Sequence, residues 1–207
     1  MDTPSCKRKS CNQLTEPINH GRFDCPLNPR YEDVCDLKCD SGFIPHGSGQ
    51  PICGPDGHWS VGNYRCKDTE RPQFLNCPHS SIIYADKNLD YIKYIWEDLV
   101  ATDNSGQVSV KQISGRPKGT RLEKGTYSFS FTATDTEGLT VSCNFKKVVE
   151  ILTCLPPDFD DKLMMYDCKG YQYGDSCDLS CKRSQPLVGN ASITCDKDNR
   201  EIPQTFW

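Results

Sequence analysis

Cysteine is the residue type in this chain that most clearly could do chemistry, because 14 of the 207 residues are cysteines. Thiols at this density are joined in disulfides, bound to metal or used in catalysis, since many free thiols oxidise and exchange. Zinc and redox sites commonly use a Cys-x-x-Cys pair, and the sequence contains none. The four histidines, His20, His46, His58 and His79, likewise form no His-x3-His cluster. The sequence therefore predicts disulfides.

Catalytic motifs are absent from the sequence. Catalysis requires a nucleophile, a base and an orienting group held together. The sequence has no Gly-x-Ser-x-Gly, no His-Glu-x-x-His and no phosphate-binding glycine loop. We therefore expect no catalytic residue, no cofactor and no enzyme activity.

Two acidic loops could supply oxygen ligands for calcium, Asp103-Asn104-Ser105-Gly106 and Asp135-Thr136-Glu137-Gly138. The same residue types are what tight turns require. The fuller Asp-x-Asp-x-Asp spacing of a calcium loop is missing. The sequence is therefore interpreted as having turns at these positions and no metal site.

Charge and hydropathy exclude two further classes of partner. A net charge of −4 and a pI of about 5.6 give no general attraction to nucleic acid. No stretch approaches the roughly 18 apolar residues of a membrane span. The first residues also lack the apolar core of a signal peptide, which a disulfide protein needs for export. We therefore expect an internal segment of a secreted chain that continues covalently into further modules.

The cysteine spacing contains an internal repeat. From Cys11 the following cysteines lie at offsets of 14, 24, 28, 42 and 55, and from Cys154 at offsets of 14, 23, 27 and 41. The local sequence is also repeated, since Cys35-Asp36-Leu37-Lys38-Cys39 resembles Cys177-Asp178-Leu179-Ser180-Cys181. The sequence predicts two copies of one module, and the second copy ends before its sixth cysteine.

The segment between the copies has a different pattern, with Cys77 and Cys143 as its only cysteines from about residue 71 to 151. Residues 126–133 alternate apolar with small polar side chains, which is the period of a half-buried strand. Similar alternation occurs at residues 92–96 and 141–145, with turn residues between. This pattern predicts an antiparallel β-sandwich.

The first copy resembles a sushi domain, also called a complement control protein module. The resemblance rests on the four cysteines of that family, a glycine-aromatic pair and a late tryptophan: Cys11, Cys39, Cys53, Cys66, Gly42-Phe43 and Trp59. It implies Cys11–Cys53 and Cys39–Cys66 bridges and a structural role for the tryptophan. Cys25 and Cys35 resemble the extra bridge of some sushi domains.

The middle segment resembles the HYR (hyalin repeat) domain, an immunoglobulin-like sandwich. The matching motifs are Asn76-Cys77-Pro78, Trp96, Ala101-Thr102-Asp103-Asn104-Ser105-Gly106, Gly125-Thr126-Tyr127, Thr132-Ala133-Thr134-Asp135 and Cys143-Asn144-Phe145. The resemblance implies a Cys77–Cys143 bridge and a structural role for Trp96.

The second copy resembles a sushi domain through Cys154, Cys181 and Cys195, with Cys168 and Cys177 as an extra pair. It departs from the family at Lys182-Arg183-Ser184, where a glycine-aromatic pair is expected. The resemblance implies Cys154–Cys195 and Cys168–Cys177 bridges. It leaves Cys181 unpaired in this chain, and Cys6 unpaired as the last cysteine of a preceding module.

The expected fold is all-β, with small disulfide-rich sushi modules flanking an immunoglobulin-like sandwich, like beads on a string. The expected domains are the tail of a preceding sushi module and a linker at 1–10, sushi at 11–67, HYR at 68–152, and a truncated sushi domain at 153–207. This order resembles the sushi-repeat-containing proteins of the extracellular matrix. It also resembles larger matrix proteins that combine sushi, HYR, EGF-like and von Willebrand A modules.

The expected function is non-catalytic and extracellular, namely protein–protein or matrix adhesion. The expected partners are extracellular or cell-surface proteins, with glycosaminoglycan as a further candidate and no membrane insertion. Two alternatives remain open: a complement-type regulatory module, and the non-catalytic arm of a larger secreted enzyme. One glycosylation sequon, Asn190-Ala191-Ser192, fits an exported glycoprotein.

Disulfide mapping by mass spectrometry tests the modular interpretation. Protein secreted from an oxidising host, with free thiols alkylated, is expected to yield the pairs Cys11–Cys53, Cys39–Cys66 and Cys77–Cys143. Cys6 and Cys181 are expected to be alkylated. Mostly free or metal-bound thiols would contradict the extracellular assignment.

Overall fold

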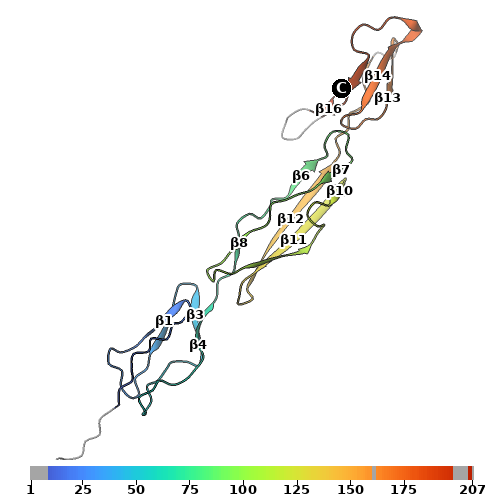
Figure 1. Ribbon diagram of the computed structural model, residues 1–207. Coiled ribbons are helices and arrows are strands. Elements are labelled where there is room, and N and C mark those ends of the chain that lie inside the picture. Colours follow the sequence, from blue (N-terminus) through green and yellow to red (C-terminus); the bar gives the residue numbers. More distant parts are fainter. Residues whose placement is uncertain (1–8, 160–161, 198–204, 207) are drawn as a thin grey trace, which may run out of the picture. The chain divides into compact units, whose positions relative to one another are not determined.

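The computed structural model describes residues 9–159, 162–197 and 205–206 (Figure 1). Their regular structure is β-strand apart from one three-residue 3₁₀ turn, Lys182–Ser184, which confirms the all-β prediction. The chain forms two compact units. Unit 1 contains the described part of Met1–Leu75 with Val100–Val110 and Thr132–Val141, and unit 2 contains Asn76–Leu99, Lys111–Phe131 and the described part of Ser142–Trp207.

The first part of unit 1 consists of two short antiparallel ladders. Strand β1 (Gly21–Asp24) pairs with β2 (Asp36–Cys39), and β3 (Phe43–Gly47) pairs with β4 (Tyr64–Asp68). Disulfides Cys11–Cys53, Cys25–Cys35 and Cys39–Cys66 cross-link this region. Four of these cysteines are buried, and with Leu37, Pro29 and Pro51 they form its buried apolar residues: Cys11, Cys35, Cys53 and Cys66. The bridges therefore make up much of a core that the short strands could not supply.

Trp59 lies against the start of this region. Its backbone forms an isolated bridge with Cys53, and its indole Nε1 donates a hydrogen bond of 2.7 Å to the carbonyl of Asn12. The indole N–H of a partly buried tryptophan usually finds such a partner. This contact ties the loop before β4 to the chain that follows Cys11.

The middle of the chain forms a four-stranded sheet in the order β6-β12-β11-β9. These strands are β6 (Ser81–Tyr84), β9 (Ser109–Ser114), β11 (Gly125–Thr134) and β12 (Thr140–Glu150). Two shorter ladders complete this region: β5 (Gln73–Phe74) with β8 (Ala101–Thr102), and β7 (Tyr91–Lys93) with β10 (Arg121–Glu123). The burial along β11 and β12 alternates, as the sequence pattern predicted for half-buried strands.

Aromatic rings form the core of unit 2. Trp96, 9% exposed, has its ring centroid 5.3 Å from that of Phe129 and 6.1 Å from that of Phe131. Phe129 also stacks on Phe145 at 5.0 Å. The Cys77–Cys143 disulfide closes a 66-residue loop around this core, which the chain-entropy estimate values at about 4 kcal/mol. Both the rings and the bridge hold the sheet to the chain that covers it.

One strand pairing differs from the antiparallel expectation. Strand β12 pairs with β6 in parallel, with Lys147 opposite Ser81. A parallel pair requires a long crossover between its strands. Here the chain between β6 and β12 supplies it, since this chain contains β7 to β11. Alternation within single strands carries no information on the direction of a partner so far away in sequence.

Lys147 occupies a core-facing position on β12, between Phe145 and Val149. Its ammonium donates hydrogen bonds of 2.7 Å to the carbonyl of His79 and to the hydroxyl of Ser81. Burial lowers the pKa of Lys147 below its ordinary value. The apolar stem therefore packs in the core while the charged end has its polar partners, which is how a buried lysine becomes tolerable.

The last part of unit 2 contains a three-stranded sheet in the order β13-β14-β15, from β13 (Met164–Cys168), β14 (Ser176–Cys181) and β15 (Ser192–Thr194). A short ladder joins β16 (Asp196–Lys197) to β17 (Thr205–Phe206). Disulfides Cys154–Cys195 and Cys168–Cys177 close loops of 41 and 9 residues, against 42 and 10 for Cys11–Cys53 and Cys25–Cys35. This similarity supports the proposal that the second copy is also a sushi domain.

Phe129 provides a test of the aromatic core. Truncation by Phe129→Ala should lower the free energy of unfolding by about 3–5 kcal/mol, because the side chain is 2% exposed and its removal leaves a cavity among the rings. Urea denaturation followed by tryptophan fluorescence measures this change. Ile113→Ala is the control, since Ile113 is 58% exposed on β9 and its truncation should cost well under 1 kcal/mol. Equal losses for the two variants would contradict the assigned core.

Candidate functional site

Three aspartates from distant parts of the sequence meet in unit 1. Asp68 is the last residue of β4, Asp103 follows β8 directly, and Asp135 follows β11. One carboxylate oxygen of each lies within 4.8 Å of those of the other two. We call these three residues the aspartate cluster.

The turn that begins at Asp103 fixes the direction of its carboxylate. Its Oδ1 accepts hydrogen bonds from the backbone N–H of Ser105 (2.9 Å) and from the hydroxyl of Ser105 (2.5 Å). Gly106, with a φ of 79°, closes the turn by donating its N–H to the Asp103 carbonyl at 3.1 Å. Asp at the start and Gly at the end are the residues that such a turn requires.

The turn at Asp135 repeats this arrangement. Its Oδ1 accepts the backbone N–H groups of Glu137 and Leu139, each at 2.8 Å, and Gly138 has a φ of 85°. Asp68 follows the same rule without a glycine, since its Oδ1 accepts the N–H of Glu70 at 3.0 Å. In all three aspartates, therefore, one oxygen is held by the chain two residues further on.

The second oxygen of each aspartate has no hydrogen-bond partner. Oδ2 of Asp68, Asp103 and Asp135 is buried and unpaired. As whole residues, Asp68 is 2% exposed and Asp135 8% exposed. Buried carboxylate oxygens without a partner are uncommon, because their desolvation goes uncompensated.

The pKa of Asp103 reflects two opposed effects. Burial raises the pKa of Asp103, but the hydrogen bonds from the hydroxyl and the backbone of Ser105, together with the neighbouring Asp68 carboxyl group, outweigh burial, so this pKa lies below its ordinary value. These hydrogen bonds favour the anion. Asp103 thus carries its negative charge close to the carboxyl groups of Asp68 and Asp135.

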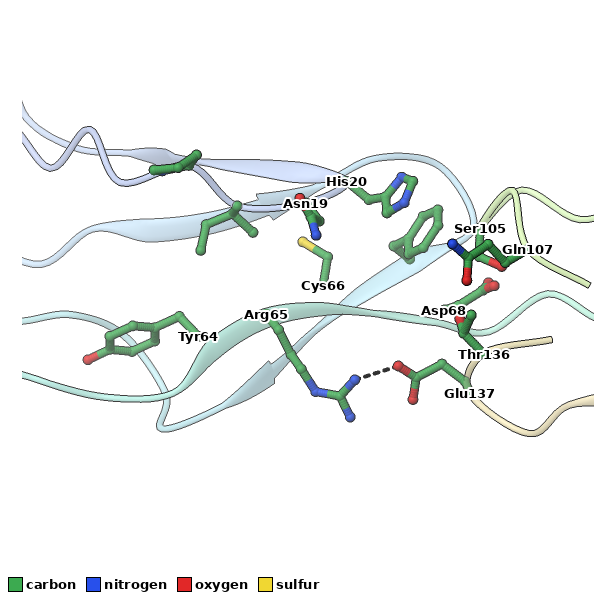
Figure 2. Close-up of a pocket in the computed structure, with 13 residues that line it drawn as sticks. Asn19, His20, Tyr64, Arg65, Cys66, Asp68, Ser105, Gln107, Thr136 and Glu137 are labelled. Carbon is green, nitrogen blue, oxygen red and sulfur yellow. Dashed lines mark hydrogen bonds and ion pairs between the residues drawn. The ribbon is translucent and has the colours of Figure 1, made fainter.

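Asp68 also lines a cavity of about 500 Å³ in unit 1 (Figure 2). His20 and Phe43 stack on one side with ring centroids 4.2 Å apart, and Arg65 forms an ion pair with Glu137 on another. Figure 2 shows Asp68 beside Ser105 and Thr136 at the end of the cavity. The full lining is Pro17, Ile18, Asn19, His20, Phe43, Tyr64, Arg65, Cys66, Asp68, Ser105, Gln107, Thr136 and Glu137.

The structure brings together residues that the sequence had placed in separate turns. Sequence reasoning treated Asp103 and Asp135 as turn residues, which they are, and did not consider Asp68. The local signal for Asp68 is weak: it lies two residues after Cys66 on the same face of β4, and both are buried. Only the pairing of distant strands makes the three residues neighbours.

The remaining predicted site residues lie elsewhere. Asn190 is exposed in the chain before β15, where its glycosylation remains a prediction. Cys181 is the free cysteine among the described residues and is half-buried at the end of β14. Cys6 lies outside the described residues.

Asp135 offers a test of how the cluster is held. Asp135→Ala should lower the free energy of unfolding by about 1–3 kcal/mol, because two part-buried N–H groups lose their shared acceptor. Asp135→Asn keeps an acceptor oxygen and removes one of three neighbouring negative charges, so its free energy of unfolding should not fall below that of the unmodified chain. Urea denaturation in the presence of a chelator measures both. Asp56→Ala is the control, since the exposed Asp56 carboxylate accepts one N–H, from His58; a loss as large as that of Asp135→Ala would contradict the argument.

Comparisons with known proteins agree with the domain types that the fold presents. Residues 11–66 match the family model of the Sushi repeat (SCR repeat), and residues 67–149 match that of the HYR domain. A chain of a protocadherin structure aligns over 92% of this chain and 65% of its own, with 10% identity and a TM-score of 0.29, which is too low to support any argument.

Similar proteins extend the match to nearly the whole chain. "Sushi repeat-containing protein SRPX2" of Xenopus laevis is 28% identical over 194 residues, 92% of this chain and 42% of that protein. SRPX2 of Homo sapiens is 26% identical over 96% of this chain and 43% of its own length. "Sushi repeat-containing protein SRPX" of Homo sapiens is 25% identical over 95% of this chain and 42% of its own length. The chain spans less than half the length of these relatives. It consists of a sushi domain followed by a HYR domain and a further C-terminal segment, and its relatives are sushi repeat-containing proteins.

Proposed function

We propose that this chain is a non-catalytic extracellular segment that binds other proteins, in the matrix or on cell surfaces. The observation that carries the proposal is the domain content: a sushi domain and a HYR domain follow one another over residues 11–149. These families are non-catalytic, and the relatives over nearly the whole chain are sushi repeat-containing proteins.

The covalent structure supports an extracellular location. Six disulfides cross-link the described residues, and disulfides persist in oxidising compartments. None of the helices among the described residues has the length and apolar character needed to cross a membrane. Small cross-linked β-domains keep their surfaces in one conformation, which lowers the entropy cost of binding.

An exposed apolar pair in the sushi domain supports such contacts. Val34 and Ile52 face each other in an isolated antiparallel bridge, and they are 43% and 48% exposed. The Cys11–Cys53 and Cys25–Cys35 disulfides anchor the residues next to them. A rigid, exposed apolar pair can contribute to the desolvated centre of an interface. We assign this pair, the Val34–Ile52 pair, to the contact surface.

A solid-phase adhesion assay tests the proposal. The full chain, secreted with its disulfides intact, is immobilised and offered to adherent cells, purified matrix proteins and heparin. We expect saturable attachment of cells or of a matrix protein that is lost after reduction and alkylation, because the binding surfaces depend on the cross-linked fold. Binding to heparin alone, abolished by moderate salt, would favour glycosaminoglycan as the partner.

Variants locate the surface. Val34→Asp with Ile52→Asp should weaken binding about tenfold or more by placing charge in the interface centre. The matched control is Ile113→Asp, since Ile113 is 58% exposed on β9 and outside the sushi domain. Attachment that survives reduction, or no attachment to any surface, would contradict the proposed function.

A further inference from the structure

The aspartate cluster holds three carboxyl groups close together, and part of each has no hydrogen-bond partner in the protein. One carboxylate oxygen of each of the three aspartates lies within 4.8 Å of those of the other two, and the buried Oδ2 atom of each has no hydrogen-bond donor. Like charges at this distance repel, and burial strengthens the repulsion by lowering the local dielectric constant. Such an arrangement persists in folded proteins when one of the carboxyl groups takes up a proton or when a further group supplies positive charge.

Basic side chains of the described residues do not supply that charge. None of their ion pairs involves a member of the aspartate cluster. Arg65, on the same strand as Asp68, instead pairs with Glu137. Polar donors nearby are already directed to the Oδ1 atoms, which leaves the three Oδ2 atoms free to bind one ligand.

We propose that Asp68, Asp103 and Asp135 form a calcium-binding site. Oxygen ligands lie about 2.3–2.6 Å from Ca²⁺, so two ligands on opposite sides of the ion are about 4.8 Å apart. The three carboxylate oxygens lie within that separation of one another. One ion can therefore be reached by all three without moving their backbones far.

The chemistry of the ligands favours calcium over other metals. The cluster contains only hard oxygen donors, whereas zinc sites are built from cysteine and histidine. Three carboxylates leave places in a six- to eight-fold shell for water and carbonyl groups. Magnesium prefers to keep its own water and a strict octahedron, so it should bind more weakly.

Binding would connect three segments that are distant in sequence. The end of β4, the turn after β8 and the turn between β11 and β12 would share one ion inside unit 1. Each carboxylate is already oriented through its Oδ1, so little side-chain entropy is lost when the ion binds. Calcium would therefore stabilise unit 1 in proportion to its concentration.

Isothermal titration calorimetry tests the site directly. The full chain is stripped with a chelator, dialysed and titrated with CaCl₂, then separately with MgCl₂. We expect one calcium per chain, with a Kd of about 10⁻⁴–10⁻³ M, the range of extracellular calcium modules, and at least about tenfold weaker magnesium binding. Thermal unfolding followed by circular dichroism should show a rise in Tm of about 5 °C at about 10 mM calcium.

Asparagine variants separate a calcium site from a merely structural cluster. Asp68→Asn, Asp103→Asn and Asp135→Asn each retain an acceptor for the turn while removing one charge. Each should weaken calcium binding at least about tenfold and remove the calcium-dependent rise in Tm. In chelator, their Tm should equal or exceed that of the unmodified chain, because one repulsive charge is gone. Asp56→Asn is the control, since the Asp56 carboxylate also accepts an N–H two residues on but lies outside the cluster.

Three results would overturn the proposal. The first is an absence of saturable heat and of any Tm shift in the unmodified chain at about 10 mM calcium. The second is calcium binding that survives in the triple asparagine variant. The third is an equal loss of Tm with and without calcium in the single variants, which would show a structural role only. None of these results bears on the adhesion assay, so the two proposals fail independently.

Discussion

The disulfides are the constraint on which the rest of this structure depends. The strands of the first domain have four or five residues, and its buried apolar residues are chiefly cystines. Without cross-links, so small a core would not offset the loss of chain entropy on folding. Closing the Cys25–Cys35 loop of 10 residues is worth about 3 kcal/mol on the chain-entropy estimate, which is comparable to the net stability of a small domain. The bridges also hold β4 in place, and β4 carries Asp68 to the aspartate cluster.

Two buried charged features show how differently the chain treats polar groups in its interior. Lys147 has its ammonium paired with a carbonyl and a hydroxyl, so its position on the core face of β12 is satisfied locally. In the aspartate cluster each Oδ1 accepts a hydrogen bond, whereas each Oδ2 is buried without a partner. The polar groups of the first feature are all paired within the polypeptide, whereas the Oδ2 atoms of the second have no partner in it. This contrast is the physical basis for proposing an ion at one place and none at the other.

The all-β class and the two domain types, sushi and HYR, were predictable, because cysteine spacing and strand alternation are local signals. Offsets from Cys11 and Cys154 indicated a repeated module, and residues 126–133 showed the period of a strand that the structure has as β11. The parallel pairing of β12 with β6 was not predicted, since alternation in one strand says nothing of its partner. The turns at Asp103 and Asp135 were predicted from their residue types, but their meeting was not.

The sequence by itself determined that most cysteines form disulfides, that the fold is all-β and where the tight turns lie. Each of these follows from residue types and their spacing along the chain. The tertiary structure alone decided which loops became neighbours. Asp68 follows Cys66 by two residues and lies far in sequence from Asp103 and Asp135, so no local pattern could place the three carboxylates within 4.8 Å of one another. The pairing of β5 with β8 returns the chain before Asp103 to the segment that follows Asp68, and the β3–β4 ladder with the Cys39–Cys66 bridge fixes the strand that carries Asp68. The fold thus gathers one strand-end aspartate and two turn aspartates into a buried group of carboxylates.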